Sequence, residues 1–239
     1  MKTRLFIFGL VFLVLSSCSP IISKIVVGKS NIYKDLKVLK NDKGQEVVFL
    51  PMVHIGKESY YKDCRTIIDS LRIDGFKVFY ENIAYKNDLD SITKLNYDKK
   101  VRSILGHSPK LDAENKSLPK FYNKRNYIVQ DYALMGITQD DTNLDLDKKA
   151  IIDSIESKYG ELGLNDCDLN TALDAEYHCK SDNESYLFAF TNEYRDPYIA
   201  SEVLKLDHEK VVLIYGKQHW YFIYPKLYKN GYNLIKGKV

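Results

Sequence analysis

Three ionisable side chains share one setting in this sequence: each follows a run of apolar residues that is typical of a buried strand. They are His54, Glu81 and His219, and the runs before them are residues 47–50, 78–80 and 211–215. In an open α/β sheet, ligands bind beyond the carboxyl ends of the strands. We therefore expect these three side chains to form a site at one edge of a sheet.

Two imidazoles and one carboxylate are a plausible set for the activation of water. Imidazole is the commonest side-chain metal ligand, and it titrates near neutral pH. Three ligands of this kind leave positions for water on Mn²⁺, Zn²⁺ or Co²⁺. His54, Glu81 and His219 therefore predict a divalent-metal site, and the alternative is that each histidine ends its strand by bonding a loop carbonyl.

Arg195 is a fourth candidate, on or beside a predicted helix. It could serve the site, or it could be a solvated surface residue that Glu193 and Asp196 neutralise. Two further stretches, Gln130-Asp131 and Asp145–Asp147, could lie near the site, but we favour helix capping for them. The sequence contains no P-loop, no Gly-x-Ser-x-Gly elbow and no His-Glu-x-x-His helix, so the chemistries of those motifs lack support.

The elements that must position these residues alternate between strand and helix periods. The sequence predicts a hairpin of residues 32–39 and 45–52 around Asn41–Gly44, a helix over 57–75 and a strand over 77–80. A strand, a helix and a second strand within about 35 residues form a βαβ unit, which implies parallel pairing. Later segments predict helices over 88–105, 148–159, 184–206 and 219–230, and strands over 210–215 and 232–235. At Asp196-Pro197 the helix over 184–206 either kinks, or a second helix begins with Asp196 as its N-cap.

These elements predict a single α/β domain: a mixed sheet with a parallel βαβ core, helices on both faces and an N-terminal hairpin. Residues 127–131 could be a short strand or the start of a helix. Residues 161–183 show little periodicity, and we expect them to be irregular. Cys167 and Cys179 lie in this region and could pair, whereas Cys64 lies on the apolar side of a helix and is expected to be buried.

The N-terminus has the features of an export signal. Basic residues precede an uncharged run from Leu5 to Leu15, which is shorter than the roughly 20 residues of a membrane-spanning helix. Leu15-Ser-Ser-Cys18 is similar to a bacterial lipobox, in which the cysteine is acylated; a simple signal peptide or a short anchor helix is the alternative. We expect a signal peptide over 1–17, a tether over 18–30 and a domain over 31–239.

Removal of the signal takes away Lys2 and Arg4 and no acidic residue, so the net charge of +3 falls to +1. A chain so nearly balanced offers no electrostatic basis for binding nucleic acid. The expected partners are the membrane, through a lipid on Cys18, and a peptide or small-molecule ligand. The expected location is the bacterial cell envelope, at the outer membrane and facing the periplasm, while the oligomeric state stays open.

Four motifs in order resemble the TraB/PrgY/GumN family, which includes the TIKI proteases and is related to the erythromycin-esterase and ChaN-like group. They are Pro51–Gly56, Phe79–Glu81, Asn192–Leu204 and Val211–His219. The family carries two Gly-x-x-His motifs, a Glu after the second strand and an Arg that begins a helix. Here the second Gly-x-x-His is complete, from Gly216 to His219, whereas Pro51 occupies the glycine position of the first.

The resemblance implies an α/β domain in which two histidines and a glutamate form a site, associated in the TIKI proteins with metal-dependent peptide hydrolysis. By this resemblance His54, Glu81 and His219 would bind the metal or activate water. Arg195 would orient an acidic group or stabilise an oxyanion. Two functions compete: a membrane-anchored, metal-dependent hydrolase, and a non-catalytic lipoprotein that binds haem or a similar ligand in the same cleft.

Overall fold

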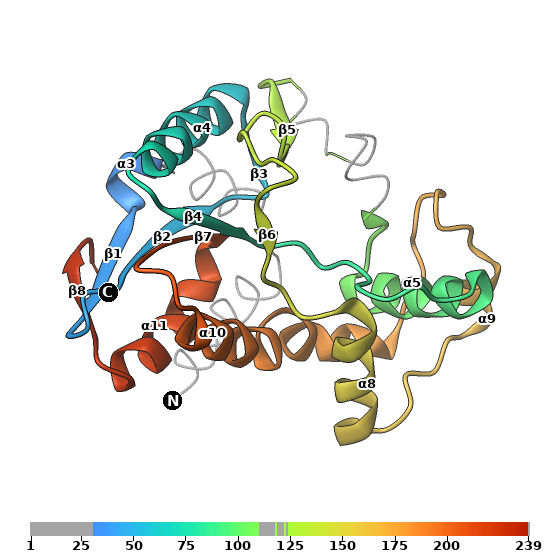
Figure 1. Ribbon diagram of the computed structural model, residues 1–239. Coiled ribbons are helices and arrows are strands. Elements are labelled where there is room, and N and C mark those ends of the chain that lie inside the picture. Colours follow the sequence, from blue (N-terminus) through green and yellow to red (C-terminus); the bar gives the residue numbers. More distant parts are fainter. Residues whose placement is uncertain (1–30, 110–117, 119–121, 123, 239) are drawn as a thin grey trace, which may run out of the picture. The chain divides into compact units, whose positions relative to one another are not determined.

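The computed structural model describes residues 31–109, 118, 122 and 124–238 (Figure 1). The predicted signal peptide, the lipidation site at Cys18 and the tether to residue 30 lie outside the described residues. Residues 32–239 form one compact unit. Within the described ranges, none of the helices has both the length and the apolar character needed to cross a membrane.

A six-stranded mixed sheet runs through the middle of this unit, in the order β6-β4-β7-β2-β1-β8. Its strands are β1 (Lys37–Asn41), β2 (Glu46–Met52), β4 (Lys77–Tyr80), β6 (Thr142–Asn143), β7 (Lys210–Gly216) and β8 (Tyr232–Lys236). The first four strands in that order are parallel to their neighbours, and β1 and β8 complete the sheet with antiparallel pairs. The predicted α/β class, with its parallel core and N-terminal hairpin, is confirmed.

The hairpin turn follows from its sequence. Asn41 Oδ1 accepts hydrogen bonds from the backbone N–H groups of Lys43 and Gln45. Gly44 adopts a φ of 88°, which an L side chain rarely tolerates. The predicted strand over 32–39 is wrong in its first half, because residues Ile32–Asp35 form the short helix α3 and β1 begins only at Lys37.

Both faces of the central strands are buried, because side chains alternate between the faces and helices cover each of them. From β2, Val47 and Phe49 pack into one core cluster, whereas Val48 and Leu50 pack into another. Helix α4 (Glu58–Ile73) supplies the second cluster with Ile68 and its neighbours. Helices α10 (Arg195–Lys205) and α11 (Trp220–Lys229) pack in the first, on the opposite side of the sheet (Figure 1).

The predicted βαβ unit of β2, α4 and β4 is present, but its two strands are not neighbours. Strand β7, from the C-terminal part of the chain, lies between them and pairs in parallel with both. The topology thereby brings the end of β7 beside the ends of β2 and β4. A separate two-stranded ribbon of β3 (Ile55–Lys57) and β5 (Tyr127–Val129) follows directly from His54.

A third core cluster joins helices away from the sheet. It contains apolar residues of α5 (Ser91–Leu105), α8 (Lys148–Tyr159) and the π-helix η2 (Ala189–Glu193). The region predicted as irregular, 161–183, contains the five-residue helix α9 (Asp166–Asn170) and the disulfide Cys167–Cys179. Cys64 is buried in α4 without a disulfide partner.

The predicted helix over 184–206 is divided into three short elements. A 3₁₀ helix, η1 (Asp182–Tyr186), comes first, η2 follows, and α10 begins at Arg195. The predicted start of a second helix at Asp196-Pro197 is close to the observed one, since α10 begins at Arg195 and Pro197 lies in its first turn, where the missing N–H lacks an intrahelical partner in any case. Asp196 is not the N-cap, however, because the break lies at Tyr194, between the π-helix and α10.

Candidate functional site

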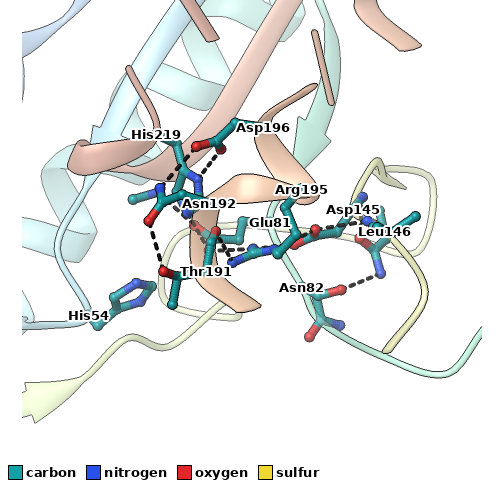
Figure 2. A network of polar contacts seen from close by, with 12 residues as sticks. His54, Glu81, Asn82, Asp145, Leu146, Thr191, Asn192, Arg195, Asp196 and His219 are labelled. Carbon is teal, nitrogen blue, oxygen red and sulfur yellow. Dashed lines mark hydrogen bonds and ion pairs between the residues drawn. The ribbon is translucent and has the colours of Figure 1, made fainter. Parts of the chain in front are cut away.

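The carboxyl ends of β2, β4 and β7 lie side by side, since the three strands are parallel and adjacent. Glu81 directly follows β4, and His219 closes the short 3₁₀ helix η3 (Lys217–His219) after β7. His54 lies two residues beyond β2. Figure 2 shows Glu81 and His219 in one polar network with residues from α10 and η2, and His54 beside that network.

Glu81 occupies the centre of the network and is only 8% exposed. Its Oε1 accepts a hydrogen bond from Arg195 Nη2 at 2.7 Å and lies 3.1 Å from His219 Nε2. Its Oε2 accepts from the backbone N–H of Gly216 at 2.6 Å. Burial favours the neutral acid, but the hydrogen bond to His219 and the charge of Arg195 outweigh it and hold the pKa of Glu81 well below its usual value. Glu81 is therefore a buried carboxylate.

His219 bridges two carboxylates. Its Nδ1 bonds Asp196 Oδ1, and its Nε2 faces Glu81 Oε1. Burial lowers the pKa of His219, but the hydrogen bonds to Asp196 and Glu81 outweigh burial and raise the pKa to about 9. A carboxylate can only accept, so both ring nitrogens carry protons when both contacts are hydrogen bonds. In this arrangement His219 is an imidazolium at neutral pH.

Asp196 is fully buried and is held from the side away from His219. Its Oδ2 accepts from Asn192 Nδ2 at 2.9 Å, and Asn192 Oδ1 accepts from the Thr191 hydroxyl at 2.8 Å. Both partners belong to the π-helix η2, a rare form that is frequent at functional sites. Sequence reasoning treated Asp196 only as a neighbour of Arg195 or a helix cap, and its place beside a predicted site residue was the one available signal.

Arg195 lies behind Glu81 with 2% of its surface exposed. Its guanidinium donates twice to Asp145, at 2.9 and 2.5 Å, and once each to Glu81 and to the carbonyl of Thr191. Burial lowers the pKa of Arg195, but bonds to Asp145 and the charges of both acids outweigh burial and raise it. The alternative of a solvated surface arginine is wrong, while the predicted contact with an oxyanion stays a prediction.

In each of the two stretches predicted to cap helices, Gln130-Asp131 and Asp145–Asp147, one residue reaches the site and another accepts a hydrogen bond from a nearby backbone N–H. Asp145 is fully buried and pairs with Arg195, so it belongs to the network. Asp147 caps α8 through a hydrogen bond from Ala150 N, and Asp131 Oδ1 accepts from Leu134 N. Gln130, in contrast, reaches the site.

His54 is the exposed member of the predicted set. Its Nδ1 lies 2.9 Å from Gln130 Oε1, and its carbonyl accepts from the backbone N–H of Gln130 at 2.8 Å. Because the amide oxygen is an acceptor, this contact places a proton on Nδ1, and in the tautomer with that proton alone the lone pair is on Nε2. Gln130 therefore fixes both the position and the tautomer of His54.

Gly216 is the point at which the three predicted side chains meet. A Cβ atom placed on Gly216 would lie 3.3 Å from each of Glu81 Oε2, His219 Cδ2 and His54 Nε2. The backbone φ of Gly216 is −51°, so the glycine is needed for space and not for its backbone conformation. The prediction that His54, Glu81 and His219 gather at one sheet edge is consistent with this geometry.

The donor types suit a divalent cation, although the ligands are not arranged around an open position. Among the described residues, no group of three or more His, Cys, Asp or Glu side chains is arranged so that it could hold a metal ion. The Glu81–His219 contact would have to open, with a cation replacing the proton on His219 Nε2. The charges favour such a replacement: the three carboxylates and Arg195 sum to −2, which a proton reduces to −1 and a divalent ion neutralises.

The site thus contains groups for acid–base chemistry: the exposed imidazole of His54, with Nε2 directed toward Gly216, and the buried imidazolium–carboxylate pair of His219 and Glu81. Three of its members, Asp145, Asp196 and Gln130, were not assigned to the site from the sequence. Comparison of this chain with protein-family models, with curated proteins and with solved structures finds no match, so the likeness to TraB/PrgY/GumN proteins rests on the four motifs alone.

Proposed function

We propose that this protein is a hydrolase of amide or ester bonds, with a peptide as the favoured substrate class. His54, Glu81 and His219 are the proposed ligands of a divalent metal ion. The observation that supports this proposal best is their convergence on Gly216 at the carboxyl ends of three parallel strands. If each histidine only ended its strand, nothing would require both side chains to approach the same buried carboxylate, that of Glu81.

A bound divalent ion would supply a water of lowered pKa and a Lewis acid for the substrate carbonyl. The residues of the chain have separate tasks around it. His54 presents Nε2 toward Gly216 and Glu81, with Gln130 holding the ring. Arg195 keeps Glu81 ionised and fixed, and Asp196 fixes the orientation of His219. Each proposed ligand therefore has a hydrogen-bonding partner that orients it, as is usual around metal sites.

The test is the metal content of the full chain, extracted from membranes in detergent and purified without chelators. We expect Mn²⁺, Zn²⁺ or Co²⁺ in the parent protein and its loss in His54→Ala and His219→Ala. His178→Ala is the matched control, because His178 is highly exposed and its ring contacts Glu176 instead of this network. Circular dichroism establishes that each variant is folded. Unchanged metal content in both site variants would exclude the metal-dependent proposal.

Hydrolysis is then measured on fluorescently labelled casein with each metal added in turn. Cleavage by the parent and its loss in His54→Ala would support a peptidase. A haem-dependent Soret shift that requires His54 or His219, without any turnover, would favour the non-catalytic binding lipoprotein instead.

The proposed location is the cell envelope, through a lipid on Cys18, at the outer membrane and facing the periplasm. The support is the sequence from Leu15 to Cys18 alone. Cys18→Ala should move the protein from the membrane fraction to the soluble fraction and abolish its labelling by a fatty-acid analogue. Retention of both properties would contradict acylation at this cysteine.

A further inference from the structure

A small group of exposed apolar side chains belongs to segments that adjoin network residues along the chain, and we define it as the aromatic rim: Leu187, Phe188 and Phe222. They are 44%, 53% and 41% exposed. The rings of Phe188 and Phe222 contact each other at a centroid distance of 5.6 Å with 63° between their planes. The rim therefore joins two segments that are more than thirty residues apart in the sequence.

Each part of the rim lies one helical turn from a residue of the network. Phe222 follows His219 by three positions on the continuous helical run of η3 and α11, and residues three apart share a helix face. Phe188 precedes Thr191 by three positions and Asn192 by four. The Thr191 hydroxyl, which donates to Asn192, also lies 2.8 Å from the carbonyl of Leu187.

The Thr191 hydroxyl therefore contacts both the backbone of the rim at Leu187 and Asn192, the residue that bonds Asp196. Exposed large apolar side chains that adjoin one another, next to convergent polar groups, are typical of ligand-binding sites. Glu81 and His219 are buried and His54 is exposed, so a substrate would approach the network from the side of His54. The rim adjoins that network through both of its segments.

We propose that the aromatic rim binds an apolar side chain of the substrate, aromatic or branched aliphatic, within two residues of the bond that is cleaved. This inference rests on the proposed hydrolase function and adds a substrate class to it. In a closed pocket, one methylene group changes the preference between two substrates by about 10-fold or more. Partly exposed contacts such as those of the rim should discriminate between side chains less strongly. We expect a preference of roughly fivefold for Phe, Tyr, Leu or Ile over Ala.

The experiment is cleavage of a peptide library by the purified full chain with added metal, with cut positions mapped by mass spectrometry. Phe188→Ala and Phe222→Ala should remove the apolar preference while cleavage continues. Tyr228→Ala is the matched control, because Tyr228 is an aromatic residue of the same helix α11 and is 57% exposed. Phe188→Glu should shift the preference toward Lys and Arg, a change that unfolding cannot produce.

The outcomes separate this inference from the function on which it rests. Absence of cleavage by the parent with every metal would remove both. Cleavage without an apolar preference, or a preference that both alanine variants retain, would overturn the substrate assignment alone. Loss of self-association or of vesicle binding in Phe188→Ala, with the preference unchanged, would assign the rim to a second copy or to a membrane and would also overturn it.

Discussion

Replacement of Arg195 by Met is the most direct test of the buried network. The methionine side chain is unbranched and replaces the apolar stem of the arginine, so the change removes the guanidinium and its charge while it keeps much of the packing. Asp145 and Glu81 then lose their shared guanidinium, and both are almost inaccessible to water, with 0% and 8% of their surface exposed. Two carboxylates would be left in the interior with His219 as the nearest opposite charge for Glu81.

The expected loss of stability follows from these contacts. Removal of one partner of a buried ion pair costs about 3–5 kcal/mol, because the remaining charge is uncompensated. In a domain of this size, 1 kcal/mol corresponds to roughly 2–4 °C in melting temperature, so Arg195→Met should lower the melting temperature by about 6–20 °C. Arg195→Lys should be intermediate, since an ammonium cannot donate to Asp145 in the two-bond geometry of the guanidinium.

Urea unfolding of the parent and of both variants at neutral pH measures these differences. Arg195→Met/Asp145→Asn is the informative double variant, because it removes the carboxylate that depends most on the guanidinium and should recover part of the loss. Lys62→Met is the control for a change of charge alone, as Lys62 forms an exposed pair with Glu58. A loss below about 1 kcal/mol in Arg195→Met would refute the assignment of Arg195 as the buried counter-ion.

Three further changes test the residues around Glu81. The pKa of His219 is raised from 6.5 to about 9, so protonation of His219 should stabilise the fold by roughly 3 kcal/mol in chelator-treated protein. This stabilisation should be complete below pH 6.5 and lost as the pH rises through 9. Urea unfolding across this range should show the loss in the parent and not in His219→Gln. Gln130→Met should weaken metal binding about 10- to 100-fold by releasing the His54 ring, as measured by Co²⁺ titration; an unchanged affinity would contradict its role. Gly216→Ala should cost about 1–3 kcal/mol in urea unfolding, whereas Gly163→Ala, with open space around its Cα, should not.

The sequence predicted the elements best where a local pattern determined them. Strand β4 and helix α8 match their predicted ranges, because an apolar run and a helical period are each complete within the segment. The start of the domain was misassigned because its local pattern is too short to distinguish a helix from a strand. Ile32 and Leu36 lie four residues apart, and one turn of helix satisfies so short a pattern as well as a strand does.

Long-range contacts had no such pattern. The position of β7 between β2 and β4 could not be predicted from the sequence, because strand order depends on packing across the whole sheet. Asp145 and Arg195 are fifty residues apart, and their pairing is visible only after the ends of β6 and α10 are placed together. The three strand-end residues could be predicted because the rule for parallel sheets concerns strand ends, not particular partners.

Pro51 occupies the position at which the TraB/PrgY/GumN motif that this segment resembles has glycine, yet the proline removes no hydrogen bond from the sheet. Its carbonyl accepts a hydrogen bond from the Tyr60 hydroxyl of α4, which shows that this peptide edge faces away from β7. In a strand, the N–H and C=O of one residue point to the same side, so the N–H that proline lacks is not one that β7 needs. Strand β1 pairs with β2 only as far as Phe49, so no ladder bond is lost on the other side either.

The space that a glycine would provide comes from the other motif. Pro51 pairs with Tyr215 across the ladder, one position before Gly216, and it is Gly216 that adjoins Glu81, His219 and the Nε2 atom of His54. Both histidines therefore approach the carboxylate over the same glycine. A proline in the first motif is compatible with this arrangement, because Gly216, and not residue 51, lies against the three side chains.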